Sequence, residues 1–189
     1  MKNEKLISVI KKYGYLALLG LGVLGLILII LFTSTPTAAP EVNEPVNANQ
    51  VTFGLPVLDA TVVKNFNDKA LQYNDTLNQY EIHLGMDFVA VANSDVCAVL
   101  DGTVTEIYND YLDGTVMVIS HGNNFKSVYG SLSDSLTVKV GDTVKKGDVI
   151  GKISASSAGE LNTGNHLHFE LLENDVNVDP AGYLNLTDK

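Results

Sequence analysis

The sequence is poor in cysteine and in positive charge. Its single cysteine, Cys97, excludes a disulfide within the chain, and the hydrophobic run Val96–Leu100 around it predicts a buried side chain rather than a nucleophile. Lysine and arginine total 12 against 22 acidic residues, which gives a net charge of −10. The first fourteen residues hold four lysines and one glutamate, so the rest of the chain carries about −13. This charge would repel phosphates, and we expect no nucleic-acid partner.

Charged residues are absent from Tyr15 to Phe32. As a helix, these 18 residues would be about 27 Å long, enough to cross a membrane. Lysines precede this stretch and the next one is Lys64, so the positive-inside rule predicts a cytoplasmic tail at 1–14, a transmembrane helix at 15–32 and an outer domain in a single-pass cell-membrane protein. The competing interpretation is a cleaved signal peptide, but its hydrophobic core would be shorter than this one.

Residues 33–50 contain three prolines and show no hydrophobic periodicity, which predicts an extended linker. The remaining residues, 51–185, suffice for one domain with a hydrophobic core, and we expect no second folded domain.

Helical patterns are scarce in the outer domain. Short runs rich in Val, Ile and Tyr alternate with Gly, Asp and Asn, which is typical of an antiparallel all-β fold. We predict a hairpin at Val99–Val104, a buried strand at Thr115–Ser120 and its partner strand at Phe125–Tyr129. The segment Asn67–Tyr80 is open between helix and loop.

Two motifs carry candidate chemistry: His-Leu-Gly-Met-Asp from His83 to Asp87, and His-Leu-His-Phe-Glu from His166 onwards. Residues i and i+2 of a strand share one face, so His166 and His168 should project to the same side. A turn around Gly85 could bring His83 and Asp87 to His168, and such a set of nitrogen and oxygen donors suits Zn²⁺. Three protein ligands leave a position for water, as in catalytic zinc sites. A lone His-x-His pair is as often a surface feature, but the two motifs together favour zinc.

These motifs resemble those of the lysostaphin and LytM type zinc endopeptidases, peptidase family M23, over about Phe53 to Tyr183. The resemblance implies a LytM-like antiparallel β-sandwich domain and a substrate among the cross-link peptides of peptidoglycan. It also implies that His83, Asp87 and His168 are the zinc ligands. By the same resemblance, His166 is a catalytic base that does not itself bind the metal.

One position departs from the family pattern. Active members have a histidine in a Tyr-x-His-Leu motif, whereas this chain reads Tyr-Gly-Ser-Leu, with Ser131 in place of the histidine. A hydroxyl cannot accept a proton near neutral pH, and losing such a group typically lowers the rate about 10²- to 10⁴-fold. We therefore expect bound zinc with impaired catalysis. His121 lies in a predicted turn, where we expect a solvent-facing structural residue rather than a substitute for the missing histidine.

A segment with two Gly-Asp turns, at Gly141 and Gly147, separates the two motifs. Glycine at such turns allows positive φ. A similar unit occurs in LytM domains and in lipoyl or biotinyl carrier domains. The lipoylated Asp-Lys-Ala motif follows that unit in carriers, whereas Asp68-Lys69-Ala70 lies some seventy residues before it here, so we interpret it as coincidence.

Several phrases outside the zinc motifs resemble the sporulation members of the family: Leu55–Asp59, Val63–Phe66, Tyr73–Thr76 and Val128–Ser133. That resemblance implies a forespore membrane protein of the engulfment channel, whose outer domain binds the ring-forming domain of stage III sporulation protein AH. The first functional hypothesis is thus a membrane-anchored, zinc-binding scaffold. The alternative is an active metalloendopeptidase that cuts peptidoglycan cross-links.

Overall fold

The computed structural model describes residues 11–12 and 51–186. The chain divides into two units, residues 1–50 and 51–189, and the strands and the candidate site belong to the second. The predicted transmembrane helix at 15–32 and the linker at 33–50 lie outside the described residues. Among the residues that are described, no helix has the length and hydrophobicity needed to cross a membrane.

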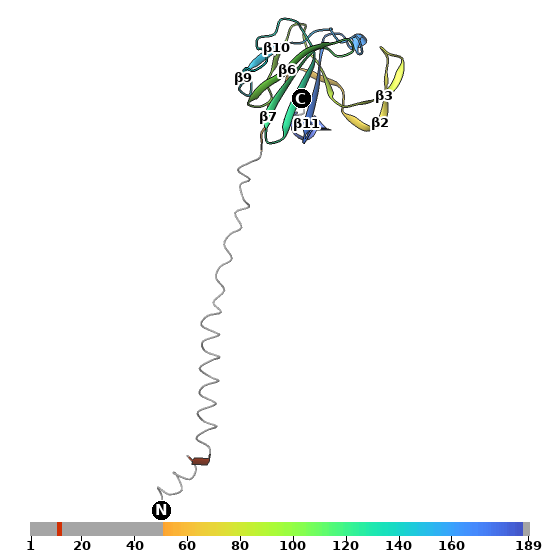
Figure 1. Cartoon of the computed structure of the whole chain (residues 1–189). Helices are drawn as coiled ribbons and strands as arrows, with labels where there is room; N and C mark the ends of the chain where they lie inside the picture. Colours follow the sequence, from red (N-terminus) through yellow and green to blue (C-terminus); the bar gives the residue numbers. More distant parts are fainter. Residues whose placement is uncertain (1–10, 13–50, 187–189) are drawn as a thin grey trace, which may run out of the picture. The chain divides into compact units, whose positions relative to one another are not determined.

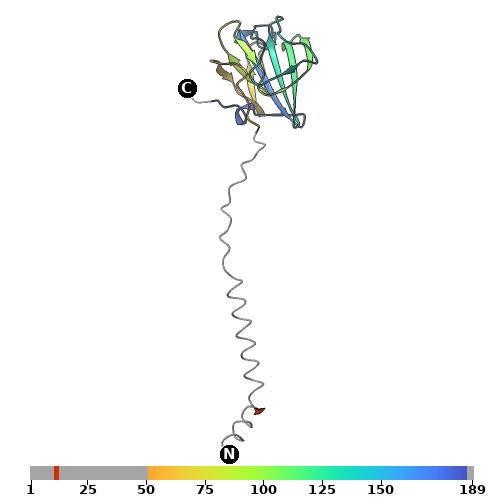
Figure 2. The ribbon, with the colours of Figure 1, turned by 90° about the vertical axis from the view of Figure 1, so that its left-hand side faces the viewer.

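One eight-stranded antiparallel sheet dominates the domain (Figures 1 and 2). Its strand order is β1-β4-β11-β8-β7-β6-β9, and β12 pairs with β11. The strands are β1 (Thr61–Lys64), β4 (Met86–Val89), β6 (Gly102–Asp110), β7 (Gly114–Gly122), β8 (Phe125–Leu132), β9 (Thr143–Val144), β11 (His166–Glu173) and β12 (Val176–Val178). The prediction of an antiparallel all-β domain is therefore confirmed.

Two smaller sheets complete the domain. Strands β5 (Asp95–Cys97) and β10 (Val149–Lys152) form one pair, and β2 (Asn67–Asn74) and β3 (Gln79–His83) form a hairpin that extends from the main body in Figure 1. Two short 3₁₀ helices follow, η1 (Leu161–Thr163) and η2 (Pro180–Gly182). Buried residues beside the β5–β10 pair join those of the main sheet in one core cluster, so this pair covers part of one sheet face.

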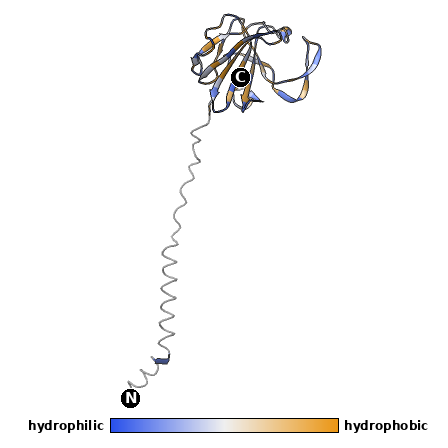
Figure 3. Cartoon of the chain, viewed as in Figure 1, coloured by the Kyte–Doolittle hydropathy of each residue, from blue (hydrophilic) through white to orange (hydrophobic). Residues whose placement is uncertain are grey.

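Period-two alternation in β4 and β11 separates the core from the candidate site. Leu167, Phe169 and Leu171 of β11 are buried in the core cluster together with Met86 and Phe88 of β4. The ring of Phe169 packs edge-on against those of Tyr129 and Phe88, at centroid distances of 5.3 and 6.4 Å. Each such buried side chain contributes about 1.5–3 kcal/mol of stability. Figure 3 shows the mixed hydrophobic and hydrophilic colouring along the strands. The intervening residues of β4 and β11 project from the opposite face of the sheet, which is the face of the candidate site.

Several local predictions can be compared with the structure. The buried strand at Thr115–Ser120 and its partner at Phe125–Tyr129 are confirmed as parts of β7 and β8. Glycines 141 and 147 have the expected positive φ, at 92° and 89°. Cys97 is buried, and this burial raises the pKa of its thiol, as expected for an unreactive side chain.

Two predictions were wrong. Val99–Val104 is not a hairpin, because it connects β5 and β6, which pair with different strands in different sheets. Asn67–Tyr80 is neither helix nor loop: it forms most of the β2–β3 hairpin, whose turn contains Asn78 at φ 54°. The first error arises because the partners of β5 and β6 lie elsewhere in the chain, and the second because the mostly exposed residues of this segment show no sustained hydrophobic alternation.

Candidate metal centre

Strand register places Asp87 opposite His168. In the pairing of β4 with β11, His168 lies across from Asp87, and on its other side His168 lies across from Gly130 of β8. Directly opposed residues of an antiparallel pair project from the same face, with Cβ atoms about 5 Å apart. Asp87 Oδ1 lies 2.9 Å from His168 Nδ1.

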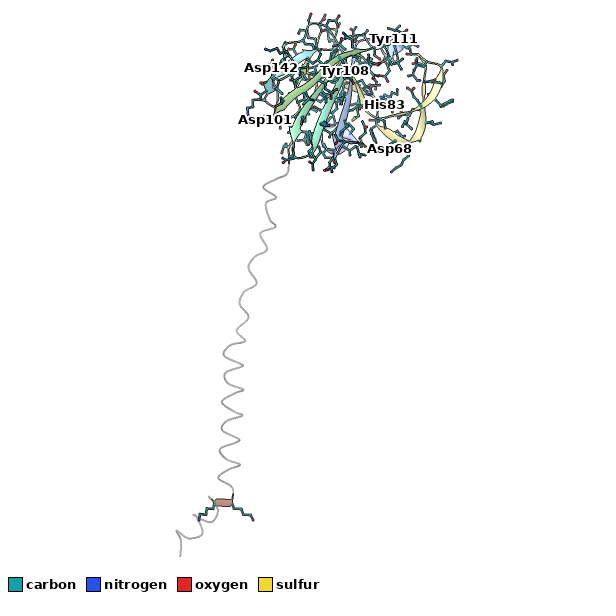
Figure 4. All side chains as sticks on the ribbon, in the orientation of Figure 1. Asp68, His83, Asp101, Tyr108, Tyr111 and Asp142 are labelled. Atoms are coloured by element: carbon teal, nitrogen blue, oxygen red, sulfur yellow. The ribbon has the colours of Figure 1, made fainter. Side chains whose placement is uncertain are left out.

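His83 reaches the same point from the end of β3. Its Nε2 lies 3.2 Å from Asp87 Oδ1 and 3.3 Å from His168 Nδ1. Figure 4 shows His83 where the β2–β3 hairpin meets the main sheet. Gly85, between His83 and Asp87, gives the space for this approach: a Cβ atom there would lie only 2.8 Å from Nε2 of His168.

Hydrogen bonds fix the ring orientations of both histidines. The carbonyl oxygen of Asn65 can only accept, so at 3.0 Å it requires a proton on Nδ1 of His83 and leaves Nε2 free as a ligand. On the other ring, Nε2 of His168 donates to Glu170 Oε1 over 3.3 Å, and Asn177 Nδ2 donates to Glu170 Oε2 over 2.8 Å. Metal-binding histidines commonly have such partners on the second nitrogen, which leaves Nδ1 of His168 for a metal.

The three donor atoms fit a zinc ion. Zinc bound tetrahedrally at about 2.0–2.1 Å requires ligand atoms about 3.3 Å apart. The three observed separations, 2.9, 3.2 and 3.3 Å, are close to that value. The second oxygen of the buried Asp87, Oδ2, has no hydrogen-bond partner among the described residues. An unpaired buried carboxylate oxygen is costly, and a cation at this point would relieve that cost.

Charge interactions in the protein without metal shift the pKa values of the cluster. Burial alone would lower the pKa of His168, but hydrogen bonds to Asp87, Glu160 and Glu170 raise it well above its usual value. Burial alone would raise the pKa of Asp87, but its bonds to His168 and His83 lower it. A proton on His168 thus balances the carboxylates, and zinc must displace it.

The cluster also contains a carboxylate that the sequence motifs did not predict. Glu160 offers an oxygen within the same group of donors, all lying within 4.8 Å of one another. Lys64 Nζ lies 2.8 Å from Glu160 Oε1, and His166 Nε2 lies 3.3 Å from Glu160 Oε2. The carbonyl oxygen of Gly164 accepts from His166 Nδ1 over 2.8 Å, so Nε2 of His166 is directed at Glu160.

The cluster borders an open pocket. His83, Glu160, His168 and Glu170 line it, together with Asp113 and other residues of the β2–β3 hairpin and the β6–β7 turn. A molecule in this pocket could therefore reach the histidine and carboxylate side chains.

Ser131 and His121 do not join the cluster through any hydrogen bond found in the structure. Ser131 is fully buried at φ 56°, and its hydroxyl donates to the carbonyl oxygen of Ser154 over 3.0 Å. His121 is half-buried, and its Nε2 lies 2.6 Å from Oγ of Ser127. The expectation of a solvent-facing His121 was thus only partly right, because its ring is held in a polar network.

Sequence reasoning gave no role to Glu160, Glu170 or Lys64. Glu170 could have been found, since it is two residues beyond His168 on the same strand face. Glu160 lies just before η1 in an irregular loop, and Lys64 ends β1, so no periodic pattern links either residue to the histidines.

Comparisons with known proteins identify the family of this domain. The model of Peptidase family M23 matches residues 81–180, which include His83, Asp87, His166 and His168. Stage II sporulation protein Q of Bacillus subtilis is 33% identical over 142 residues, which cover 69% of this chain and 50% of that protein. This chain therefore spans about half the length of that relative.

Solved structures show the same fold. A chain in the structure of the SpoIIQ-SpoIIIAH pore forming complex is 31% identical, with a TM-score of 0.62, and the match covers 70% of this chain and 90% of that one. A zinc containing peptidase from Vibrio cholerae is 31% identical, with a TM-score of 0.60, over 68% of this chain and 39% of that one. The family model covers more than half of the chain, and with its LytM-like fold this chain belongs to peptidase family M23.

Proposed function

We propose that this chain is a membrane-anchored M23 domain that binds zinc, is catalytically impaired, and acts as an intermembrane scaffold in endospore formation. Its partner would be a domain like the SpoIIIAH component of the solved complex. Residues 15–32 would anchor it in the forespore membrane with the N-terminus in the cytoplasm, and residues 51–185 would bind the partner outside.

The observation that carries the proposal is the extent of the likeness to SpoIIQ. The match covers 90% of the SpoIIQ-type chain in the complex, but only 39% of the zinc containing peptidase. The domain is thus comparable in extent to the binding module of a two-protein complex, whereas it resembles only a part of the peptidase. A rigid β domain can bind a partner through strand edges and loops without any catalysis.

The site supports the same proposal. His83, Asp87 and His168 would hold zinc, which could supply Lewis acidity and activate water. By the motif resemblance, Ser131 stands where active members have a further histidine, and its hydroxyl donates to a backbone carbonyl. Without that imidazole, proton transfer would depend on His166, which is directed at Glu160.

The alternative is an active peptidoglycan cross-link endopeptidase. It is supported by the complete donor set and by His166 beside it. Under this alternative, His166 would act as the general base and a peptide would occupy the pocket.

A paired experiment separates these functions. The full chain would be titrated with a purified SpoIIIAH-type domain by calorimetry, and separately incubated with cell walls at saturating zinc, with an active M23 endopeptidase as the positive control. The scaffold proposal predicts saturable binding and no release of cross-link peptides. Zinc-dependent peptide release without partner binding would refute it and favour the hydrolase.

A further inference from the structure

Glu160 places its carboxylate beside the ring nitrogens of His83 and His168 that are directed at the cluster. Its Oε1 lies 3.7 Å from Nε2 of His83, and its Oε2 lies 3.5 Å from Nδ1 of His168. These distances are close to the separation of about 3.3 Å between ligands of a tetrahedral zinc ion. The two distances involve different oxygens of the carboxylate, and one oxygen of Glu160 lies within 4.8 Å of the donor atoms of His83, Asp87 and His168.

Ion pairing holds the Glu160 carboxylate in this place. Its side chain is only 13% exposed and lies between Lys64, at 2.8 Å, and His166, at 3.3 Å. Each oxygen therefore has one cationic or hydrogen-bonding partner outside the set of His83, Asp87 and His168. A surface carboxylate would lose side-chain entropy on binding a metal, whereas this one is already ordered.

The backbone around Glu160 is also fastened on two sides. The carbonyl oxygen of Gly159 accepts from Nδ2 of Asn74 over 2.9 Å, which joins the loop to the β2–β3 hairpin. The amide of Gly159 donates to the carbonyl oxygen of Leu112 over 2.9 Å, and the hydroxyl of Ser157 donates to the same carbonyl. The loop is thus also hydrogen-bonded to the β6–β7 turn. These bonds hold the backbone of Glu160 beside the cluster.

We propose that Glu160 is the fourth protein ligand of the metal and closes the site to water and substrate. This inference rests on the zinc binding in the proposed function. With two imidazoles and two carboxylates, the ion has four protein ligands, which is the arrangement of structural zinc. The closed shell makes the site inert for a reason independent of Ser131. It also fastens the Glu160 loop, the β2–β3 hairpin and the β4–β11 pair to one ion.

The test uses cobalt as a spectroscopic replacement for zinc in the purified full chain. The visible absorption of bound Co²⁺ reports the ligands around it, and azide serves as an added ligand that needs an open position. The unaltered chain should show a Co²⁺ spectrum that azide leaves unchanged. In Glu160→Gln, azide should change the spectrum, and zinc affinity should fall by at least about 10- to 100-fold, the range seen when groups behind the ligands are lost.

Glu173→Gln is the matched control, since Glu173 is also a partly buried glutamate that accepts a hydrogen bond, from the hydroxyl of Tyr183. This variant should behave as the unaltered chain does. An azide-sensitive spectrum in the unaltered chain would overturn the proposal, and so would unchanged zinc affinity in Glu160→Gln. The first of these results does not depend on how any variant folds.

The outcome also separates this inference from the proposed function. If the unaltered chain binds cobalt with an open position, the fourth ligand is refuted while zinc binding stands. If no variant binds cobalt at all, the zinc part of the proposed function fails and the inference fails with it. Partner binding is measured separately and is unaffected by either result.

Discussion

Replacing Gly85 with alanine should disrupt the metal centre without removing any ligand. A Cβ atom at this position would lie 2.7 Å from the carbonyl oxygen of Phe169 and 2.8 Å from both Cε1 and Nε2 of His168. Comfortable contacts between such atoms begin near 3.5 Å, so the overlap is about 0.7–0.8 Å. Relief of the first contact requires a backbone shift that strains the β4–β11 pairing, and relief of the other two requires the ring of His168 to move from its present position.

The expected magnitudes follow from this overlap. Overpacking of this kind destabilises by about 1–3 kcal/mol. For a domain of this size, that corresponds to a drop in Tm of roughly 3–15 °C. Zinc affinity should fall about 10- to 100-fold, as when the hydrogen bonding of a ligand is lost.

Thermal unfolding and zinc titration of the full chain test this prediction. Gly182→Ala is the control, because a Cβ atom there would meet no described atom within 4 Å and the residue has no positive φ. The control should be neutral or slightly stabilising. If Gly85→Ala bound zinc as tightly as the control and unfolded at the same temperature, the packing around His168 would be incorrectly described.

Three further predictions concern pH, Ser131 and the core. Because the pKa of His168 is raised in the folded protein, its stabilisation is complete below about pH 6.5 and is lost as pH rises through the folded pKa. With a chelator present, the free energy of unfolding in urea should therefore fall as the pH is raised, whereas with zinc bound it should change little. A free energy that falls with zinc but not with the chelator would contradict the raised pKa of His168. Ser131→His should leave zinc affinity unchanged, because the hydroxyl of Ser131 contacts Ser154 and not the cluster. Cleavage of cell walls should appear only when Ser131→His is combined with Glu160→Gln. Cleavage by Ser131→His alone would count against a closed site. Tyr129→Phe should lower the free energy of unfolding by about 1–3 kcal/mol, because it leaves the buried amide of Val99 without its acceptor. Equal urea midpoints for Tyr129→Phe and the unaltered chain would disprove this.

The sequence was most informative where chemistry follows strand periodicity. The alternation in His166–Glu170 placed His166 and His168 on one face, and the structure agrees: both rings lie within 3.5 Å of Glu160 Oε2. The approach of His83 and Asp87 to His168 could be predicted only from the paired motifs and the family resemblance. Their role as zinc ligands, and that of His166 as a base, stay predictions.

Long-range contacts explain what the sequence did not reveal. Glu160 reaches the cluster because Asn74 binds the carbonyl oxygen of Gly159, 85 positions further on, and Lys64, 96 positions before Glu160, pairs with its carboxylate. Neither contact leaves a local pattern in the sequence. Asn67–Tyr80 was missed for another reason: its two strands pair with each other and are mostly exposed, so the segment shows no sustained hydrophobic alternation.

Zinc content with and without His83 tests the account most directly. The full chain, His83→Ala and His121→Ala would be stripped with a chelator, incubated with equimolar zinc, freed of excess metal and analysed for bound zinc. The unaltered chain and His121→Ala, whose ring contacts Ser127 instead of the cluster, should each keep one zinc ion per molecule, and His83→Ala should keep almost none. Equal zinc in His83→Ala and His121→Ala would contradict the metal centre.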